Sequence, residues 1–462
     1  MENVDAQQLF GIVLTIAVFA LIGVLSGKKV KTKSDYYVAG QRFGAISVAG
    51  TTAGMFVGGG SVIGTAQLAF TDGFSGLYFS IGCCLALVLM GLGFAKPIRK
   101  TDCQTIQEMI AREYGSLACL LATFLGILGF YINNIAHFLS GISLIGSLFP
   151  FSTLVSSLIT GGLILVSVFM GGFLGMSFIN VLKTFILMAT VLTASILIGI
   201  TTDNFSTMAA ALPERYFSLF PRSMNSDIGN FLSTTLGIMS TQTTIQAIFA
   251  ARSDKDSRIG FVLGAFLLPV VGICCVIIGM YMKMVAPDIS SLEAFPRFVI
   301  MHTQGFVCGV ILATTLIAVT SAGVSVLLGI AGILLNNIYL RFRPDASSKK
   351  QLLFSRLVII ALLTITTLII NTGASDGIMQ YNFLSMGMRS AVLFLPMCAA
   401  LFMPGKISPR FAIASIVLGP VAIMLAKFVL PLPFDFIFFG MTVCAIIMVL
   451  GYWDKKLSRR RV

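Results

Sequence analysis

The 462-residue chain is 57% apolar and only 11% charged, whereas ordinary soluble domains are about one-quarter charged. This composition excludes a soluble globular protein and leaves room for about a dozen membrane helices of roughly 20 residues each. The net charge of +13 does not indicate a nucleic-acid partner, because the basic residues form short clusters between apolar runs and no continuous basic face.

Apolar runs long enough to cross a bilayer follow one another along the whole chain, so we predict an all-α polytopic membrane protein with about thirteen spans. The first run follows Glu2 and Asp5 rather than a basic segment, which predicts a membrane span and not a cleavable signal. The predicted spans are 8–27, 43–70, 75–95, 117–148, 152–171, 173–200, 228–250, 259–284, 305–339, 352–371, 376–402, 409–429 and 433–452.

The basic residues predict how these spans are oriented. With the N-terminus outside and the C-terminus inside, most of the 31 basic residues lie in inner loops or in the tail, as the positive-inside rule requires. We therefore expect a multi-pass protein of a bacterial-type inner membrane, in contact with the lipid bilayer. The outer side then holds only Arg215, Arg222, Lys283, Arg297 and Lys427.

The span 43–70 is too long and too interrupted for one straight helix. Its middle reads Gly58-Gly59-Gly60-Ser61, and consecutive glycines are poor helix formers. These glycines indicate either a close-packing helix face or a discontinuous helix whose free carbonyls line a cavity. A second polar interruption, Ser240 to Thr244 with Gln246, lies five spans later. Repeats of five spans are inverted relative to each other, and paired broken helices in inverted repeats predict a solute site at the midplane.

Few ionisable residues fall inside the predicted spans. None of the 18 acidic residues lies clearly in mid-membrane, whereas Lys183 and Arg389 lie near the middle of their spans and His137 is a third ionisable group. A charge at the bilayer centre costs at least about 2.5–3.5 kcal/mol, which favours a function over snorkelling to an interface. His137 is either a hydrogen-bonded packing residue or a substrate ligand.

Several short motifs occur in an order that resembles the sodium:solute symporters. The matching segments are Asp35-Tyr36-Tyr37-Val38-Ala39-Gly40, Gly58 to Gly64, Thr105-Ile106-Gln107-Glu108 with Arg112 and Tyr114-Gly115, Gly171-Gly172, Gln246 with Ala250-Ala251-Arg252 and Ser257 to Gly260, Val319-Thr320-Ser321-Ala322, and Asn336-Asn337-Ile338-Tyr339.

The resemblance implies a leucine-transporter-like core of five-plus-five inverted repeats, with one extra N-terminal and two extra C-terminal helices. The expected organisation is an N-terminal helix and linker over 1–34, a first repeat over 35–200, an external loop over 201–227, a second repeat over 228–402, and two helices with a basic tail over 403–462.

The resemblance also implies a sodium site made of carbonyls from the broken helix and hydroxyls from a later span. Carried over by position, its ligands are Gly54, Val57, Ile317, Thr320 and Ser321. A dehydrated hard cation needs several such oxygens, although the two hydroxyls can equally hydrogen-bond neighbouring helices. The chain departs from the family where Ile179-Asn180 and Lys183 stand in place of Thr-Asp and Gln. It also has Gly323 and Asn337 where aspartates are common.

We therefore predict a secondary active transporter that imports a small organic solute, anionic or zwitterionic, with a sodium gradient as the driving force. Arg389 is the expected partner of a solute carboxylate, because a guanidinium binds carboxylate bidentately. Asn180 and Lys183 join the ion-coupling set, and no cofactor is expected beyond Na⁺ or H⁺. The expected substrate-binding residues are Gly59, Ser61, His137, Asn134, Gln242, Gln246 and Arg389.

The sequence is also compatible with other functions. Lys183 can take the place of the coupling ion, which predicts proton-coupled or cation-independent transport. A transporter-like sensor would bind the solute without carrying it. An enzyme is disfavoured, because the only histidines, His137 and His302, have no buried carboxylate nearby in the sequence.

Overall fold

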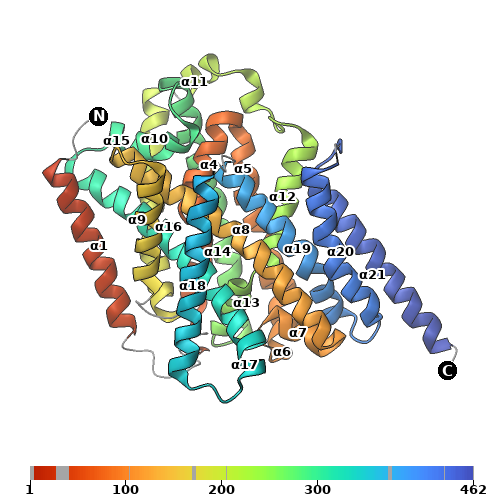
Figure 1. Ribbon diagram of the computed structural model, residues 1–462. Helices are drawn as coiled ribbons and strands as arrows, with labels where there is room; N and C mark the ends of the chain where they lie inside the picture. Colours follow the sequence, from red (N-terminus) through yellow and green to blue (C-terminus); the bar gives the residue numbers. More distant parts are fainter. Residues whose placement is uncertain are drawn as a thin grey trace.

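The computed structural model describes residues 5–27, 41–103, 105–168, 173–203, 205–372, 377–430 and 432–460, and these residues form an all-helical fold (Figure 1). The first half comprises α1 (Ala6–Gly27), α3 (Ala45–Phe56), α4 (Gly59–Asp72), η2 (Gly73–Gly76), α5 (Leu77–Leu89), the π-helical η3 (Met90–Phe94), α6 (Ala95–Lys100), α7 (Ile106–Tyr114), α8 (Ser116–Leu148), α9 (Thr153–Val168) and α10 (Phe173–Thr201).

The second half begins with two short elements and then continues with long helices. It comprises α11 (Ser206–Ala211), η4 (Glu214–Phe217), α12 (Met224–Met239), α13 (Gln242–Ala250), α14 (Asp254–Val285), η5 (Ser291–Glu293), α15 (Ala294–His302), α16 (Gly305–Leu334), the π-helical η6 (Leu335–Tyr339), α17 (Leu340–Phe342), α18 (Ser348–Asn371), α19 (Ile378–Phe402), α20 (Pro409–Phe428) and α21 (Phe436–Arg460).

Each predicted span range contains helix in the part of the chain that the structure describes. Ten helical stretches there are long and apolar enough to cross a membrane, and the apolar stretches 45–56 and 153–165 are shorter. The all-α membrane fold is therefore confirmed, while the count of thirteen crossings and the inverted repeat stay predictions. Two motifs of the resemblance, Asp35 to Gly40 and Gly171-Gly172, lie outside the described residues.

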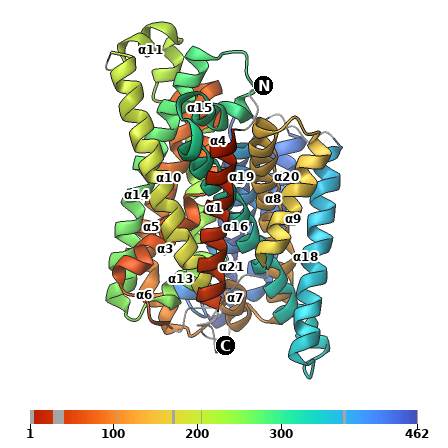
Figure 2. The same ribbon diagram turned by 90° about the vertical axis from the view of Figure 1, so that its left-hand side faces the viewer.

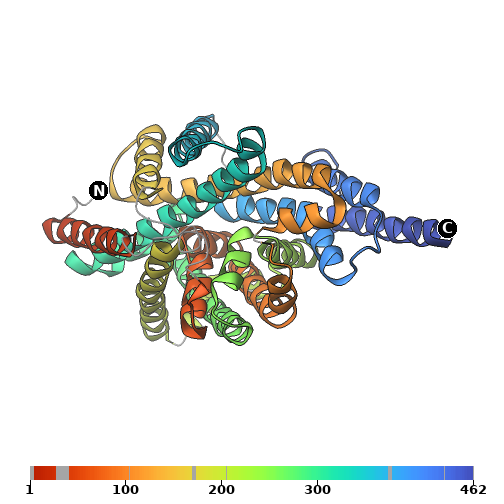
Figure 3. The same ribbon diagram turned by 90° about the horizontal axis from the view of Figure 1, so that it is seen from below.

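The terminal helices flank a central helical core. In Figures 1 and 3, α1 lies at one end of the molecule, and α20 and α21 lie at the other. Helix α1 packs against α16, and α20 packs against α19 and α21. Between them, α14 contacts both α3 and α4, while α8 packs against α16 and α19; in Figure 2, α14 and α3 lie to the left of α1 and α8 lies to its right. The two halves of the first interrupted helix, α3 and α4, thus pack within this core.

The first interrupted helix breaks between α3 and α4, where the sequence has its run of glycines. Val57 and Gly58 leave the helical conformation, and Gly58 is extended at φ −137° and ψ 178°. The Ser61 hydroxyl accepts a hydrogen bond from the Gly58 amide at 2.8 Å and donates one to its carbonyl at 2.9 Å. The discontinuous helix predicted for 43–70 is therefore present. Glycines are poor helix formers, and at the break the Ser61 side chain makes hydrogen bonds with the main chain of Gly58.

The second interrupted helix breaks between α12 and α13 at Ser240 and Thr241. Thr241 is extended at φ −95° and ψ 129°, and α13 restarts at Gln242. The hydroxyls of Ser240 and Thr241 donate to the carbonyls of Leu236 and Gly237, at 2.9 and 2.8 Å. These bonds satisfy carbonyls at the end of α12, so this predicted interruption is also present.

One end of α3 is tied to the junction of α13 and α14. The Phe43 amide donates to the Ala250 carbonyl at 3.0 Å, and the Arg252 amide donates to the Phe43 carbonyl at 2.9 Å. Asp256 accepts from the Ala45 amide at 3.1 Å and forms a 2.9 Å ion pair with Arg252. The two interrupted helices are thus joined directly at one end of the molecule.

Candidate transport site

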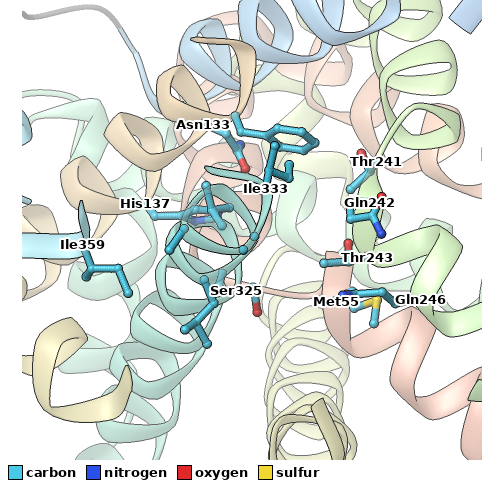
Figure 4. Close-up of a pocket in the computed structure, with 18 of the residues that line it drawn as sticks. Met55, Asn133, His137, Thr241, Gln242, Thr243, Gln246, Ser325, Ile333 and Ile359 are labelled. Atoms are coloured by element: carbon cyan, nitrogen blue, oxygen red, sulfur yellow. The ribbon is translucent and has the colours of Figure 1, made fainter. Parts of the chain in front are cut away.

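A cavity of about 700 Å³ lies between the breaks of the two interrupted helices and continues along α16 to the start of α18. The exposed Ser348 is among its lining residues, so the cavity opens at that end of the molecule. In Figure 4, Asn133 and His137 lie on one side of the cavity, and Thr241, Gln242 and Gln246 lie on the other. The remaining polar lining residues are Ser61, Thr243, Ser177, Asn180, Lys183, Ser325, Ser348, Gln351, Ser355, Arg356, Asn382 and Arg389.

The charges on this lining all have one sign. Lys183, Arg356 and Arg389 face the cavity, and no aspartate or glutamate occurs among the described residues that line it. Buried charges in proteins are normally paired, because removing an ion from water is costly. The cavity is therefore electropositive and suited to an anionic group.

Arg389 of α19 reaches the cavity beside the second break. Its side chain passes over Gly129 of α8, where an added Cβ would lie 2.8 Å from the arginine Cγ. The guanidinium donates to the Thr241 hydroxyl at 2.9 Å and to the Ser385 carbonyl at 3.3 Å, and it lies 5.0 Å from the centre of the Phe130 ring. The side chain is 3% exposed, so these neutral groups hold a charge that has little contact with water. These contacts fix the orientation of the guanidinium, so its planar set of N–H donors is preorganised to bind a carboxylate.

Lys183 of α10 reaches the hydroxyl pair on α16. Its ammonium donates a hydrogen bond to the Ser321 hydroxyl at 2.9 Å, and the side chain is 1% exposed. One turn earlier, Asn180 packs so closely against α3 that an added Cβ on Gly54 would lie 2.6 Å from the asparagine Cβ. The helices α3, α10 and α16 therefore meet at the place where the sequence predicts the ion site.

A third set of polar residues, Asn133, His137 and Asn382, lies near Gly60 at the first break. A Cβ built on Gly60 would lie 3.4 Å from the His137 ring and 3.4 Å from the Asn382 amide nitrogen. Asn133 donates to the Asn382 side-chain oxygen at 2.6 Å. The His137 Nδ1 is buried and has no hydrogen-bond partner within the described part of the chain. This group offers hydrogen bonds to a solute that lies over the glycines.

The structure brings about half of the predicted site residues to the cavity. The lining residues among them are Ser61, Asn180, His137, Lys183, Gln242, Gln246 and Arg389.

The other predicted residues lie behind this lining. Asn134 is directed toward α18, where it donates to the Thr366 hydroxyl at 3.0 Å, so it does not line the cavity. Gly59 packs on Val319, whose Cα would lie 3.1 Å from an added Cβ. Thr320 donates to the carbonyls of Leu316 and Ile317, at 3.0 and 3.2 Å. The ion-site residues Gly54, Val57, Ile317, Thr320 and Ser321 are likewise absent from the lining, and Ser321 is covered by Lys183.

Sequence reasoning missed several residues of this site. Thr241 orients Arg389, Phe130 lies under the guanidinium, and Asn382 pairs with Asn133. Asn382 and Arg389 are two turns apart on α19, so a polar face on this otherwise apolar helix was the signal that could have identified Asn382. Nothing in the sequence distinguishes Phe130 from other apolar residues.

The sequence pattern of the sodium:solute symporter family matches residues 36–419, which is most of the chain. The chain belongs to the sodium:solute symporter family. A curated relative is the uncharacterized symporter YwcA of Bacillus subtilis, which is 24% identical over 392 residues, covering 79% of this chain and 75% of the relative. Family and fold are those of transporters.

Two solved structures are similar to this symporter family member. A Na⁺-coupled sialic acid symporter, in a substrate-bound outward-open state, has a TM-score of 0.81 at 18% identity and covers 98% of both chains. A nucleobase-cation-symport-1 family transporter, in a closed conformation with bromovinylhydantoin bound, has a TM-score of 0.55 at 12% identity and covers 92% of this chain and 96% of its own. At these identities the likeness shows the fold alone.

Proposed function

We propose that this protein is a secondary active transporter that imports a small organic solute with an anionic group, either an anion or a zwitterion. The observation that carries the proposal is the cavity between the two interrupted helices, with the buried Lys183 and Arg389 on its lining and no carboxylate among the described lining residues. A solute carboxylate supplies the missing negative charge. Loss of water from that carboxylate is then compensated by charge-assisted hydrogen bonds.

The side of the membrane to which the cavity opens rests on the orientation predicted from the basic residues. In that orientation the start of α18 is on the inner side, so the cavity mouth at Ser348 and Gln351 faces the cytoplasm. In Figure 1 this is the lower end of the molecule, where α17 and α18 meet. The conformation is then one from which an imported solute leaves the central site.

Two candidates for the driving force follow from different observations. Sodium is supported by family membership, by the sodium-coupled symporter of similar fold, and by the hydroxyls of Thr320 and Ser321 beside the first break. The second candidate is transport without sodium. It is supported by the 2.9 Å hydrogen bond from the Lys183 ammonium to the Ser321 hydroxyl.

Uptake into proteoliposomes tests the proposed function. The purified protein is first screened for thermal stabilisation by organic anions, zwitterionic amino acids and neutral sugars, and each compound that stabilises it is then tried in radiolabelled form. We expect saturable uptake of an anion or zwitterion. Stabilisation only by neutral sugars would contradict the anionic solute, and binding without flux would favour a sensor.

A further inference from the structure

The most unusual contact of the transport site is made by Lys183. In the sodium site that the family resemblance implies, the cation would lie between α3 and α16, and the Lys183 side chain of α10 donates to the Ser321 hydroxyl there. We propose that the Lys183 ammonium is a built-in replacement for the coupling sodium, so that this protein carries its solute without sodium. The inference rests on the proposed function as a solute transporter and concerns only its driving ion.

The place that Lys183 occupies is defined by the first break. Around the break, Gly58 lies against α16, with an added Cβ 3.7 Å from both the Ala318 carbonyl oxygen and the Ala322 Cβ. Ser321 lies on the same stretch of α16, one residue before Ala322. The Ser321 hydroxyl is therefore an oxygen that a cation beside the break would bind, and the Lys183 ammonium binds it.

The hydrogen bonding of Ser321 leaves little for a second cation. Its hydroxyl donates to the Ala318 carbonyl at 3.2 Å and accepts from Lys183 at 2.9 Å. With its proton directed at a carbonyl, the hydroxyl has two lone pairs and Lys183 uses one of them, so a sodium ion would have to use the other, close to the ammonium. Sodium and the Lys183 ammonium would therefore share one oxygen.

Electrostatic repulsion opposes this sharing. Two unit charges about 4 Å apart repel enough, at an effective dielectric constant of about 20, to weaken the binding of the second by about a thousandfold. A nearby carboxylate would relieve that repulsion, but residue 180 is a neutral asparagine and the described cavity lining has no acidic residue. Lys183 is covalently attached, so whenever its amine is protonated the ammonium excludes sodium from this oxygen.

A fixed ammonium also links neighbouring helices, as a bound cation would. The bond from Lys183 to Ser321 joins α10 to α16 beside the broken helix. Sodium is consequently neither bound nor carried during the transport cycle. An ion gradient other than that of sodium then drives uptake.

A gradient experiment tests the inference in the wild-type protein. Proteoliposomes at constant pH are given the solute with external sodium chloride or with choline chloride of equal concentration. We expect uptake rates that agree within about twofold, because sodium affinity is reduced by about a thousandfold. Strict dependence on sodium would overturn the inference and leave the proposed function intact. Absence of uptake in both salts would instead count against the proposed function.

Two variants test the role of Lys183 without knowledge of the solute. Lys183→Gln removes the charge with little change in length, and the double variant Asn180→Asp/Lys183→Gln adds a carboxylate on the same face of α10. The readout is thermal stability in sodium chloride against potassium chloride. We expect no specific stabilisation of the wild type by sodium, and in the double variant an apparent sodium affinity at least about a hundredfold higher.

Two further variants distinguish an effect at Lys183 from a general effect of substitution on the sodium response or on folding. Lys427→Gln removes a lysine that lies 5.7 Å from the centre of the Phe436 ring, far along the chain in α20, and should leave the sodium response unchanged. If Lys183→Gln does not fold, Lys183→Met supplies a neutral side chain of similar length that suits a buried position. The inference is overturned if sodium stabilises the wild type, or if folded neutral variants gain no response to sodium.

Discussion

Replacement of Arg389 by glutamine is the sharpest test of the anionic solute. The variant keeps a polar side chain of similar shape but removes the charge and the fork of N–H donors. Arg389 in the wild type is 3% exposed, and within the described part of the chain its guanidinium contacts three neutral groups, namely the Thr241 hydroxyl, the Ser385 carbonyl and the Phe130 ring. In the variant, a carboxylate that binds there would lose this buried bidentate partner.

The expected loss of solute affinity in Arg389→Gln follows from the burial of the guanidinium. Removing one partner of a buried, hydrogen-bonded charge pair costs about 2–5 kcal/mol, which corresponds to an affinity loss of about 30-fold to 5,000-fold. Arg389→Lys should fall between the wild type and Arg389→Gln, because it keeps the charge but loses the fork. Thr241→Val should cost less, about 0.5–1.5 kcal/mol, because it removes only the hydroxyl that orients the guanidinium.

Ligand-dependent thermal shift and the KM of uptake measure these effects. Each variant is first checked for a single symmetric peak in size-exclusion chromatography, so that a folding defect is not mistaken for lost affinity. Arg356→Gln is the matched control, because Arg356 lines the same cavity near its mouth and is partly exposed. Its effect on affinity should stay below about tenfold. Unchanged affinity in Arg389→Gln would refute a solute anion paired with this residue.

Two further predictions concern the scaffold around the site. Hydrogen bonding from Arg252 lowers the pKa of Asp256 to about 2, so this carboxylate stabilises the fold above pH ~4 and loses that contribution as the pH falls toward 2. The stability difference between wild type and Asp256→Asn, followed by intrinsic fluorescence in detergent, should therefore shrink on acidification; a constant difference would contradict this. Gly59→Ala should destabilise the protein by about 1–3 kcal/mol, because the new Cβ overlaps Val319. The control Gly162→Ala has nothing within 4 Å of its Cβ and should be neutral or slightly stabilising, so equal effects of the two alanines would argue against the close approach.

Much of the site was predictable because its signals are local. Three consecutive glycines with a following serine, and a polar run in an apolar span, predicted both helix breaks, since main-chain hydrogen bonding is decided by neighbouring residues. Lys183 and Arg389 stood out because charges are rare within membrane spans. The contacts of these cations were not predictable, because Ser321 and Thr241 are about 140 residues or more away in sequence.

Predicted site residues that do not line the cavity show the same limit of prediction from sequence. Asn134 belongs to the same polar segment as Asn133 and His137, yet it is directed to Thr366 on α18. Neighbouring residues on a helix point about 100° apart, so only the rotation of α8 in the bundle decides which of them meets the solute. That rotation depends on how α8 packs against α16 and α19.

The sequence by itself determined the class of protein, the helical ranges and the positions of the breaks, because apolar length and backbone propensity act over a few residues. The tertiary structure alone decided which groups meet in the cavity, and in particular that an ammonium group from α10 binds a hydroxyl on α16. The physical reason is that hydrogen bonds and ion repulsion depend on distances of a few ångströms between distant segments, and only packing sets those distances.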